Sequence, residues 1–451
     1  MLPRFLLVFL TLLPLTWLIC QHQVSGIVTD ADGPIVRATV RLPGTLLAYR
    51  TDEQGRFDWP QPLFTRLTAS KPGYLIGYAD DPLVRLPMRD CERYEWIDPT
   101  PDRQRPQQCG NCHTAIHREW NDSSHAHSAS SASFRYFYGH VQHNLPDGVA
   151  VCHSCHAPTQ SPLSDLLHSE TPTALQGVHC DYCHKVVGVA GGEWGLQHGR
   201  YQLNLLRPDP EAEPAQLFFG PLDDVARGED AYAPIYRDSR YCAACHEGIV
   251  FGVHAYSTYR EYLSSAAKRA GKECQHCHMA PTGTMTNIAP GNGGIERPPS
   301  TLANHRFFQG SRLEMLRRSL HVVARRDANE VTASITARNV GHALPTGFPS
   351  RQIVVRLTQG NHVQDAIFGK RLRHRESDAI DPPYWLAAPE YEDTRLLPDQ
   401  MRTVHFPLTQ PHESATLTLI DRRFAIGSGY PPNDHIIGTW TMTTDCQSVE
   451  R

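Results

Sequence analysis

The 451-residue chain lacks an excess of charge of either sign, because 43 Lys and Arg face 47 Asp and Glu, a formal net charge of −4. This balance offers no basic bias toward nucleic acid, and an apolar content of 40% excludes a disordered acidic chain. Methionine is scarce, with seven residues, and beyond the first twenty residues no apolar run is long enough to span a membrane. At roughly 150 residues per domain, the length predicts about three domains.

The first twenty residues form the one long apolar run. They carry a single positive charge, Arg4, followed by apolar residues from Phe5 to Ile19. A helix of that length would cover about 22 Å, short of the roughly 30 Å hydrocarbon core of a bilayer. Residues 1–20 are therefore predicted to be a signal peptide, with a lipid-modified Cys20 or an uncleaved anchor as alternatives. We expect export to the periplasm or cell surface, with contact to a membrane only through this segment.

The rest of the chain predicts a multi-domain protein. In residues 21–90, Ala38, Val40 and Leu42 alternate with polar residues, as in a half-buried strand, and the segment is predicted to be a small β-sandwich. Residues 95–310 are predicted to be mostly α-helical or irregular, with helices over 114–120 and 258–270.

The C-terminal part is predicted to return to β-structure. A capping box at Ser311 and Glu314 opens a helix that reaches about residue 320. Residues 311–425 then form a β-sandwich-like module with strands over 331–340, 352–357, 403–408 and 415–420, and residues 426–451 a Pro/Gly-rich tail. The basic run Lys370–Arg375 is expected to be a solvated loop.

Cysteine and histidine are abundant, at 13 and 25 residues, and ten of the cysteines fall in a motif that occurs five times. Motifs 1 to 5 have the form Cys-x-x-Cys-His, and their residues are Cys109, Cys112 and His113; Cys152, Cys155 and His156; Cys180, Cys183 and His184; Cys242, Cys245 and His246; and Cys274, Cys277 and His278. In this c-type haem motif two thiols add to the vinyl groups of one haem, and the histidine becomes an axial iron ligand. Zinc ribbons also use Cys-x-x-Cys, but they do not require a histidine after every second cysteine. We therefore predict five covalently attached haem c groups.

Longer sequence elements extend the pattern beyond the motifs. The segments 120–126 (WNDSSHA), 176–180 (QGVHC), 258–262 (TYREY) and 271–279 (GKECQHCHM) resemble multihaem c-type cytochromes related to the tetrahaem cytochrome c of hydroxylamine oxidation. Two later segments, 304–307 and 339–347, resemble elements that follow the last haem in that family. Residues 24–30, 51–57 and 69–74 resemble a carboxypeptidase regulatory-like β module, which implies a β-sandwich used for contact. One departure is that residues 221–240 hold no histidine where the family implies one.

The twenty histidines outside the motifs are enough to give every iron a second axial ligand. We predict His125, five residues after Trp120, with His127 as its local rival. His305 and His342 are further candidates, and His198 is a weaker one. His342 stands out because Gly341, Pro345 and Gly347 make its loop short and stiff.

Three cysteines lie outside the motifs: Cys20, Cys91 and Cys446. An odd number means that one is lipidated, removed or free, and Cys91 could pair with Cys446. Two isolated thiols are the alternative.

Electron transfer is the function that these features favour, with a redox protein as donor or acceptor and the oligomeric state open. No Cys-x-x-Cys-Lys motif occurs, which argues against a nitrite-reductase active site. One alternative is a multihaem oxidoreductase that acts on a small nitrogen or sulfur compound at one five-coordinate haem. The other is a structural, filament-forming or docking cytochrome that uses its β modules to bind a partner.

Overall fold

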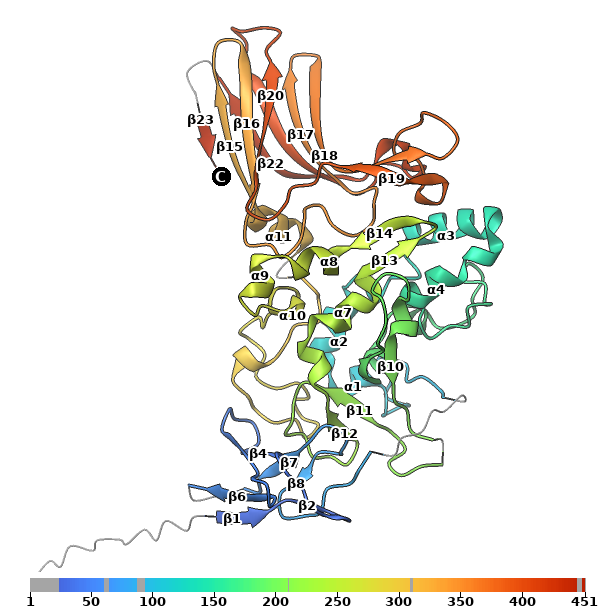
Figure 1. The fold of residues 1–451 in the computed structure, drawn as a ribbon, viewed down its shortest axis with the longest axis vertical. Coiled ribbons are helices and arrows are strands. Elements are labelled where there is room, and N and C mark those ends of the chain that lie inside the picture. The colour runs from blue at the N-terminus through green and yellow to red at the C-terminus, as the bar shows by residue number, and fades with distance from the viewer. Residues whose placement is uncertain are drawn as a thin grey trace, which may run out of the picture.

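The computed structural model describes residues 24–60, 65–86, 94–209, 211–308, 311–443 and 448–450. The predicted signal peptide, Cys20, Cys91 and Cys446 lie outside these residues. A strand-rich N-terminal part occupies one end of the molecule, a helix-bearing part the middle, and the C-terminal sheets the other end (Figure 1). This confirms a multi-domain arrangement, while the predicted domain limits and sandwich arrangements stay predictions.

The N-terminal part is built from short strands. They are β1 (Val24–Ile27), β2 (Thr29–Asp30), β3 (Gly33–Pro34), β4 (Thr39–Arg41), β5 (Ala48–Arg50), β6 (Arg56–Trp59), β7 (Thr68–Ser70) and β8 (Gly77–Tyr78). Four of them form the sheet β5-β4-β7-β8, and β1 pairs with β6 and β2 with β3. The alternation predicted around Val40 is confirmed, since Ala38 and Val40 are fully buried beside Trp59.

The segment without histidine, residues 221–240, holds this N-terminal part against the middle of the molecule. Arg41 forms a two-bond ion pair with Asp223, and the Gly44 amide donates to Asp224. Asp224 also forms an ion pair with the buried Arg297, at 2.7 Å. The segment in which the resemblance implies an iron-binding histidine therefore binds the N-terminal part instead.

The middle part consists of short helices joined by loops. Its helices are α1 (Cys109–Cys112), α2 (Thr114–Asn121), α3 (Ala132–Asn144), α4 (Ala150–His156), α5 (Thr173–Gln176), α6 (Cys180–Cys183), α7 (Ser239–His246), α8 (Thr258–Leu263), α9 (Ala266–Arg269) and α10 (Cys274–His278). The helix predicted over 258–270 is split at Ser265, whose side chain caps α9. Six short strands also occur here: β9 (Val186–Val189), β10 (Leu203–Leu205), β11 (Phe218–Gly220), β12 (Asp230–Tyr232), β13 (Glu247–Val250) and β14 (Val253–Ser257).

The C-terminal part begins with α11 (Arg312–Ser319), where both hydrogen bonds of the predicted capping box are present. The strands that follow are β15 (Leu320–Arg326), β16 (Glu330–Ala337), β17 (Gln352–Gln359), β18 (His362–His374), β19 (Ala387–Asp393), β20 (Met401–Pro407), β21 (Ala415–Arg422), β22 (Asp434–Met442) and β23 (Ser448–Glu450). They form one sheet in the order β20-β16-β15-β23 and another in the order β19-β18-β17-β21-β22. One hydrophobic core contains side chains of both sheets, among them Ile335 and Leu417.

Two predictions for the C-terminal part are wrong. Residues 426–451 are not a tail, because β22 pairs along β21 and β23 pairs with β15. Lys370–Arg375 is not a solvated loop, since residues 370–374 belong to β18. Lys370 is 3% exposed, and its ammonium group donates to the His254 carbonyl and the Ser257 hydroxyl. A lysine can be buried when its ammonium group is hydrogen-bonded. Here the partners come from a distant part of the chain, so the local sequence cannot predict the burial.

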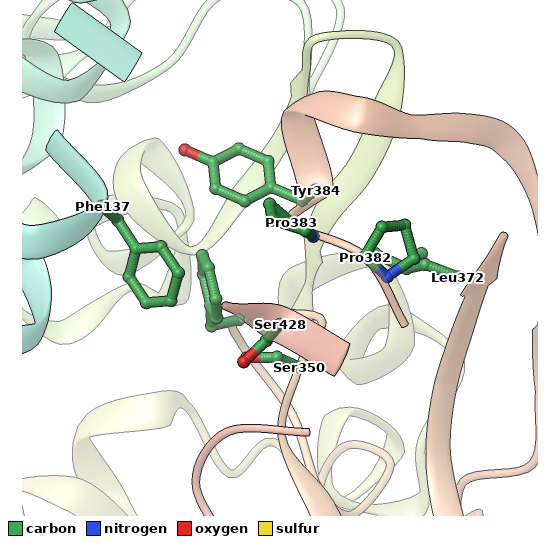
Figure 2. Close-up of a pocket in the computed structure, with 8 residues that line it drawn as sticks. Phe137, Ser350, Leu372, Pro382, Pro383, Tyr384 and Ser428 are labelled. Atoms are coloured by element: carbon green, nitrogen blue, oxygen red, sulfur yellow. The ribbon is translucent and has the colours of Figure 1, made fainter. Parts of the chain in front are cut away.

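Helix α3 joins the middle part to the C-terminal part. Phe137 of α3 faces Pro383 and Tyr384 across a small pocket (Figure 2). Its ring centre lies 5.2 Å from that of Phe348 and 5.6 Å from that of Phe424. This aromatic contact, together with Lys370, fixes the C-terminal sheets relative to the helices that carry the motifs.

Candidate functional site

All five Cys-x-x-Cys-His motifs lie in or at the end of a short helix, namely α1, α4, α6, α7 and α10. Residues three apart on a helix share a face, so each helix presents its two cysteines on one side. None of the ten motif cysteines forms a disulfide with another described cysteine. The local geometry therefore suits attachment of a flat group along one helix face, with the following histidine close by.

Four of the five motif histidines are held by a backbone carbonyl through Nδ1. His113 bonds to Ile288 at 2.9 Å, His156 to Ser128 at 2.9 Å, His184 to Phe219 at 2.6 Å and His278 to Phe307 at 3.0 Å. A carbonyl oxygen can only accept, so Nδ1 carries the proton and Nε2 keeps its lone pair. A histidine that binds a metal through Nε2 is oriented in this way.

The motifs contact one another through their thiols. Cys109 lies beside Cys180, and the interaction of the two thiols lowers the pKa of Cys109 and raises that of Cys180. In the same way Cys155 lies beside Cys245, and Cys242 lies beside Cys274. Motif 1 therefore contacts motif 3, and motif 4 contacts both motif 2 and motif 5.

The connection between these two groups runs through motif 3. The Cys183 thiol lies close enough to Cys242 and Cys245 to raise the pKa of both. Motif 4 is thus the junction of the arrangement, with motif 1 at one end and motifs 2 and 5 at the others.

The histidine of motif 4 faces a predicted second ligand. The ring centres of His246 and His125 are 6.2 Å apart, with an angle of 76° between the ring planes. Metal–imidazole bonds are about 2.0–2.1 Å long for zinc, so one metal ion between two imidazoles places their ring centres roughly 6 Å apart. Burial lowers the pKa of His125 to about 4 and that of His246 to about 3, so both rings are neutral at pH 7, the form that binds metals.

Motif 5 has the same relation to His342. The rings of His278 and His342 are nearly parallel, at 20°, with centres 6.3 Å apart. The Nδ1 of His342 bonds to the Ala343 carbonyl at 3.0 Å, which leaves its Nε2 unprotonated. The loop is fixed further by the Ala343 amide, which donates to Glu261 of α8 at 3.0 Å. A C-terminal loop thus brings an imidazole to a motif of the middle part.

The remaining predicted ligands are placed less clearly. His305 is half-buried, and its pKa is lowered to about 4 by desolvation first and then by the nearby His184 of motif 3. His198 lies beside motif 2, since its neighbour Gly199 packs on the Ser154 backbone at a positive φ of 63°. By contrast, His127 is exposed and its Nε2 bonds to the Asn121 carbonyl. The structure therefore favours His125 over its rival.

Three arginines of the C-terminal part, Arg312, Arg351 and Arg423, gather near motif 4. Arg312 forms an ion pair with Asp421, at 2.8 and 2.9 Å. Burial and the charges of Arg312 and Arg423 lower the pKa of Arg351 to about 9, and Arg351 in turn lowers the pKa of His246. The buried Nε of Arg423 has no hydrogen-bond partner among the described residues. One carboxylate for three guanidinium groups leaves positive charge that suits an anionic group.

Several residues of the site have no signal in the sequence. The carbonyls of Ile288, Ser128, Phe219 and Phe307 act through the main chain, so any residue type could supply them. Phe134 of α3, stacked on His156 at 4.5 Å, belongs to a different helix from that histidine. The arginines near motif 4 are far apart in the chain. Only the fold brings these groups to the motifs.

Within the part of the chain that the structure describes, no helix combines the length and apolar character needed to cross a membrane. Comparison with known proteins gives one family match: residues 108–185 match the model described as "Cytochrome c554 and c-prime". The matched segment contains motifs 1, 2 and 3. Neither the curated proteins nor the solved structures contain a match to the chain. The family match, over a segment that carries three attachment motifs, supports a multihaem c-type cytochrome with covalently bound haem c and a part in electron transfer.

Proposed function

We propose that the chain is a pentahaem c-type cytochrome that carries electrons in the cell envelope, with mostly bis-histidine iron coordination. Haem iron supplies a one-electron couple, and two axial imidazoles keep it closed to substrates. The observation that carries the proposal is the pair of facing imidazoles at two motifs, His246 with His125 and His278 with His342, at 6.2 and 6.3 Å. These distances match the span of one metal ion, and both motifs lie beyond the family match.

The residues of the chain perform three tasks in this proposal. The ten thiols hold the porphyrin rings, and carbonyls such as that of Phe219 fix the ring orientation and the tautomer of the motif histidines. Aromatic rings exclude water around them: Phe134 stacks on His156, and Tyr236 stacks on His184 at 5.6 Å. The contacts between motifs supply the close spacing that electron transfer requires.

From the contacts between the motif cysteines we also propose an order of electron transfer. Electrons would pass between motifs 1 and 3, then to motif 4, and from there to motif 2 or motif 5. Motif 1 lies toward the N-terminal part, and motif 5 lies toward the C-terminal part through His342. Two of the three ends of the arrangement, motifs 1 and 5, thus lie toward the two β-rich parts, which we propose as docking sites for a redox partner.

The electron-carrier proposal predicts five electrons per molecule and closed irons. Stoichiometric reductive titration of the purified holoprotein should consume five equivalents, and carbon monoxide should barely change the reduced spectrum. A carbon monoxide complex at one haem would favour the oxidoreductase alternative, and turnover of nitrite or hydroxylamine would then be assayed. Fewer than five equivalents in fully loaded protein would contradict the proposed haem number.

The arginines near motif 4 are proposed to receive haem carboxylates. Arg351 and Arg423 offer guanidinium donors to an anion, and Arg–carboxylate pairs are strong and directional. Positive charge near an iron favours its reduced state. Arg351→Gln should therefore lower the midpoint potential of one haem by on the order of 60 mV, a tenfold change in a one-electron equilibrium.

The matched control for that variant is Arg356→Gln, which breaks the ion pair between Arg356 and Asp365 in the C-terminal sheet. Potentiometry of both holoproteins would check the prediction. Equal potentials in wild type and Arg351→Gln would show that the guanidinium does not act on a haem.

A further inference from the structure

Phe307 contacts two of the histidine pairs described above at once. Its carbonyl oxygen accepts the Nδ1 proton of His278 at 3.0 Å, which fixes the histidine of motif 5. Its ring lies edge-on to the ring of His125, with centres 4.1 Å apart and planes at 85°. Phe307 therefore orients His278 of motif 5 through its main chain. Through its side chain it orients His125, which faces motif 4.

The backbone of Phe307 is held in an unusual conformation. Its φ is +62°, in the left-handed region that bulky residues avoid. The preceding residues fix the turn, because the Asn304 amide and side chain donate to the carbonyls of Met279 and Ala280, directly after motif 5. Strain of this kind persists only where the surroundings impose it, and it concentrates at functional sites. Relaxing φ to the common region would move the carbonyl away from His278 and the ring away from His125.

We propose that Phe307 is a positioning residue that couples the iron ligands of motifs 4 and 5. This inference rests on the proposed function, in which His125 and His278 bind neighbouring irons. Its consequence is that the haems of motifs 4 and 5 are tuned together. The carbonyl strengthens His278 as a ligand, and the ring keeps water from His125 and limits its rotation.

Two substitutions separate the two contacts. Phe307→Asn removes the ring but tolerates a positive φ, so the carbonyl should stay on His278. Phe307→Val carries a β-branched side chain, which disfavours a positive φ, and should disturb both contacts. Phe308→Leu is the matched control, because Phe308 is the next residue and its ring lies beside His278, with ring centres 6.1 Å apart.

The experiment uses the full holoprotein and records paramagnetic resonance spectra and haem potentials. The signal of the motif 4 haem is first identified as the one that becomes high-spin in His125→Ala, and that of motif 5 as the one that does so in His342→Ala. Phe307→Asn should shift the motif 4 signal and lower its potential as water approaches, with motif 5 unchanged. Phe307→Val should shift both signals, and Phe308→Leu should leave motif 4 as in wild type.

Two results would overturn the inference. One is an unshifted motif 4 signal in Phe307→Asn. The other is an equal shift in Phe307→Asn and Phe308→Leu, which would indicate a general loosening of the loop. If neither histidine variant produces a high-spin signal, the ligand assignments of the proposed function fail instead, which is a distinct result.

Discussion

Replacing Cys242 and Cys245 with alanine should remove one haem and separate the remaining four into groups that no longer exchange electrons rapidly. Motif 4 is the junction, since its thiols contact Cys155 and Cys274 and lie near Cys183. Ala243 and Ala244 of motif 4 belong to the two hydrophobic clusters that pack around this helix, so a porphyrin attached there would be part of the packed interior. Folding of small metal-containing domains depends on the metal group, so we also expect a large fall in the melting temperature.

The control for this variant is the corresponding change in motif 1, Cys109→Ala with Cys112→Ala. Motif 1 is at an end of the arrangement, with its thiol contact to Cys180. That variant should also lose one haem but should keep rapid exchange among the other four. Pulse radiolysis measures this exchange, and differential calorimetry measures the melting temperature. Equal effects of the two double variants on both measurements would show that motif 4 is not a junction.

His342→Ala should keep all covalent haem but convert one iron from low spin to high spin. The imidazole of His342 is nearly parallel to that of His278, and its Nε2 has a free lone pair. Alanine removes the ligand without changing any attachment cysteine. The loop itself should persist, because the Ala343 amide still donates to Glu261 and Leu344 still bridges to Leu396.

His362→Ala is the control for that substitution, since His362 is an exposed residue at the start of β18. Low-temperature paramagnetic resonance of the oxidised holoproteins counts high-spin and low-spin irons. We expect one additional high-spin iron in His342→Ala and none in His362→Ala. An unchanged low-spin count in His342→Ala would exclude this histidine as a ligand.

The sequence predicted the chemistry of the site better than its geometry. Each Cys-x-x-Cys-His motif is local, so the thiols, the adjacent histidine and the attached group follow from a few consecutive residues. The capping box at Ser311 is local in the same sense, and it is confirmed. His125 and His342 could be nominated because they stand in recognisable segments. No local pattern indicates which motif each of them faces, since that depends on packing between distant elements.

Long-range contacts account for the errors as well. The basic neighbours of Lys370 predict a solvated loop, yet partners on β14 bind its ammonium group in the interior. The two prolines before β22 are typical of a tail, yet β22 pairs with the edge of β21. Residues 221–240 contain no histidine. Instead, Asp223 and Asp224 of this segment accept hydrogen bonds from Arg41 and Gly44 of the N-terminal part.

The intact mass of the mature holoprotein tests the central claim most directly. Five thioether-linked haems should add five haem masses to that of the processed polypeptide, and acid–acetone extraction should remove none of them. The same measurement reports the processing of the N-terminal segment, because the signal-peptide and lipidation alternatives differ in mass. Five haems that survive extraction are the predicted result, and four or fewer in fully matured protein would contradict the account.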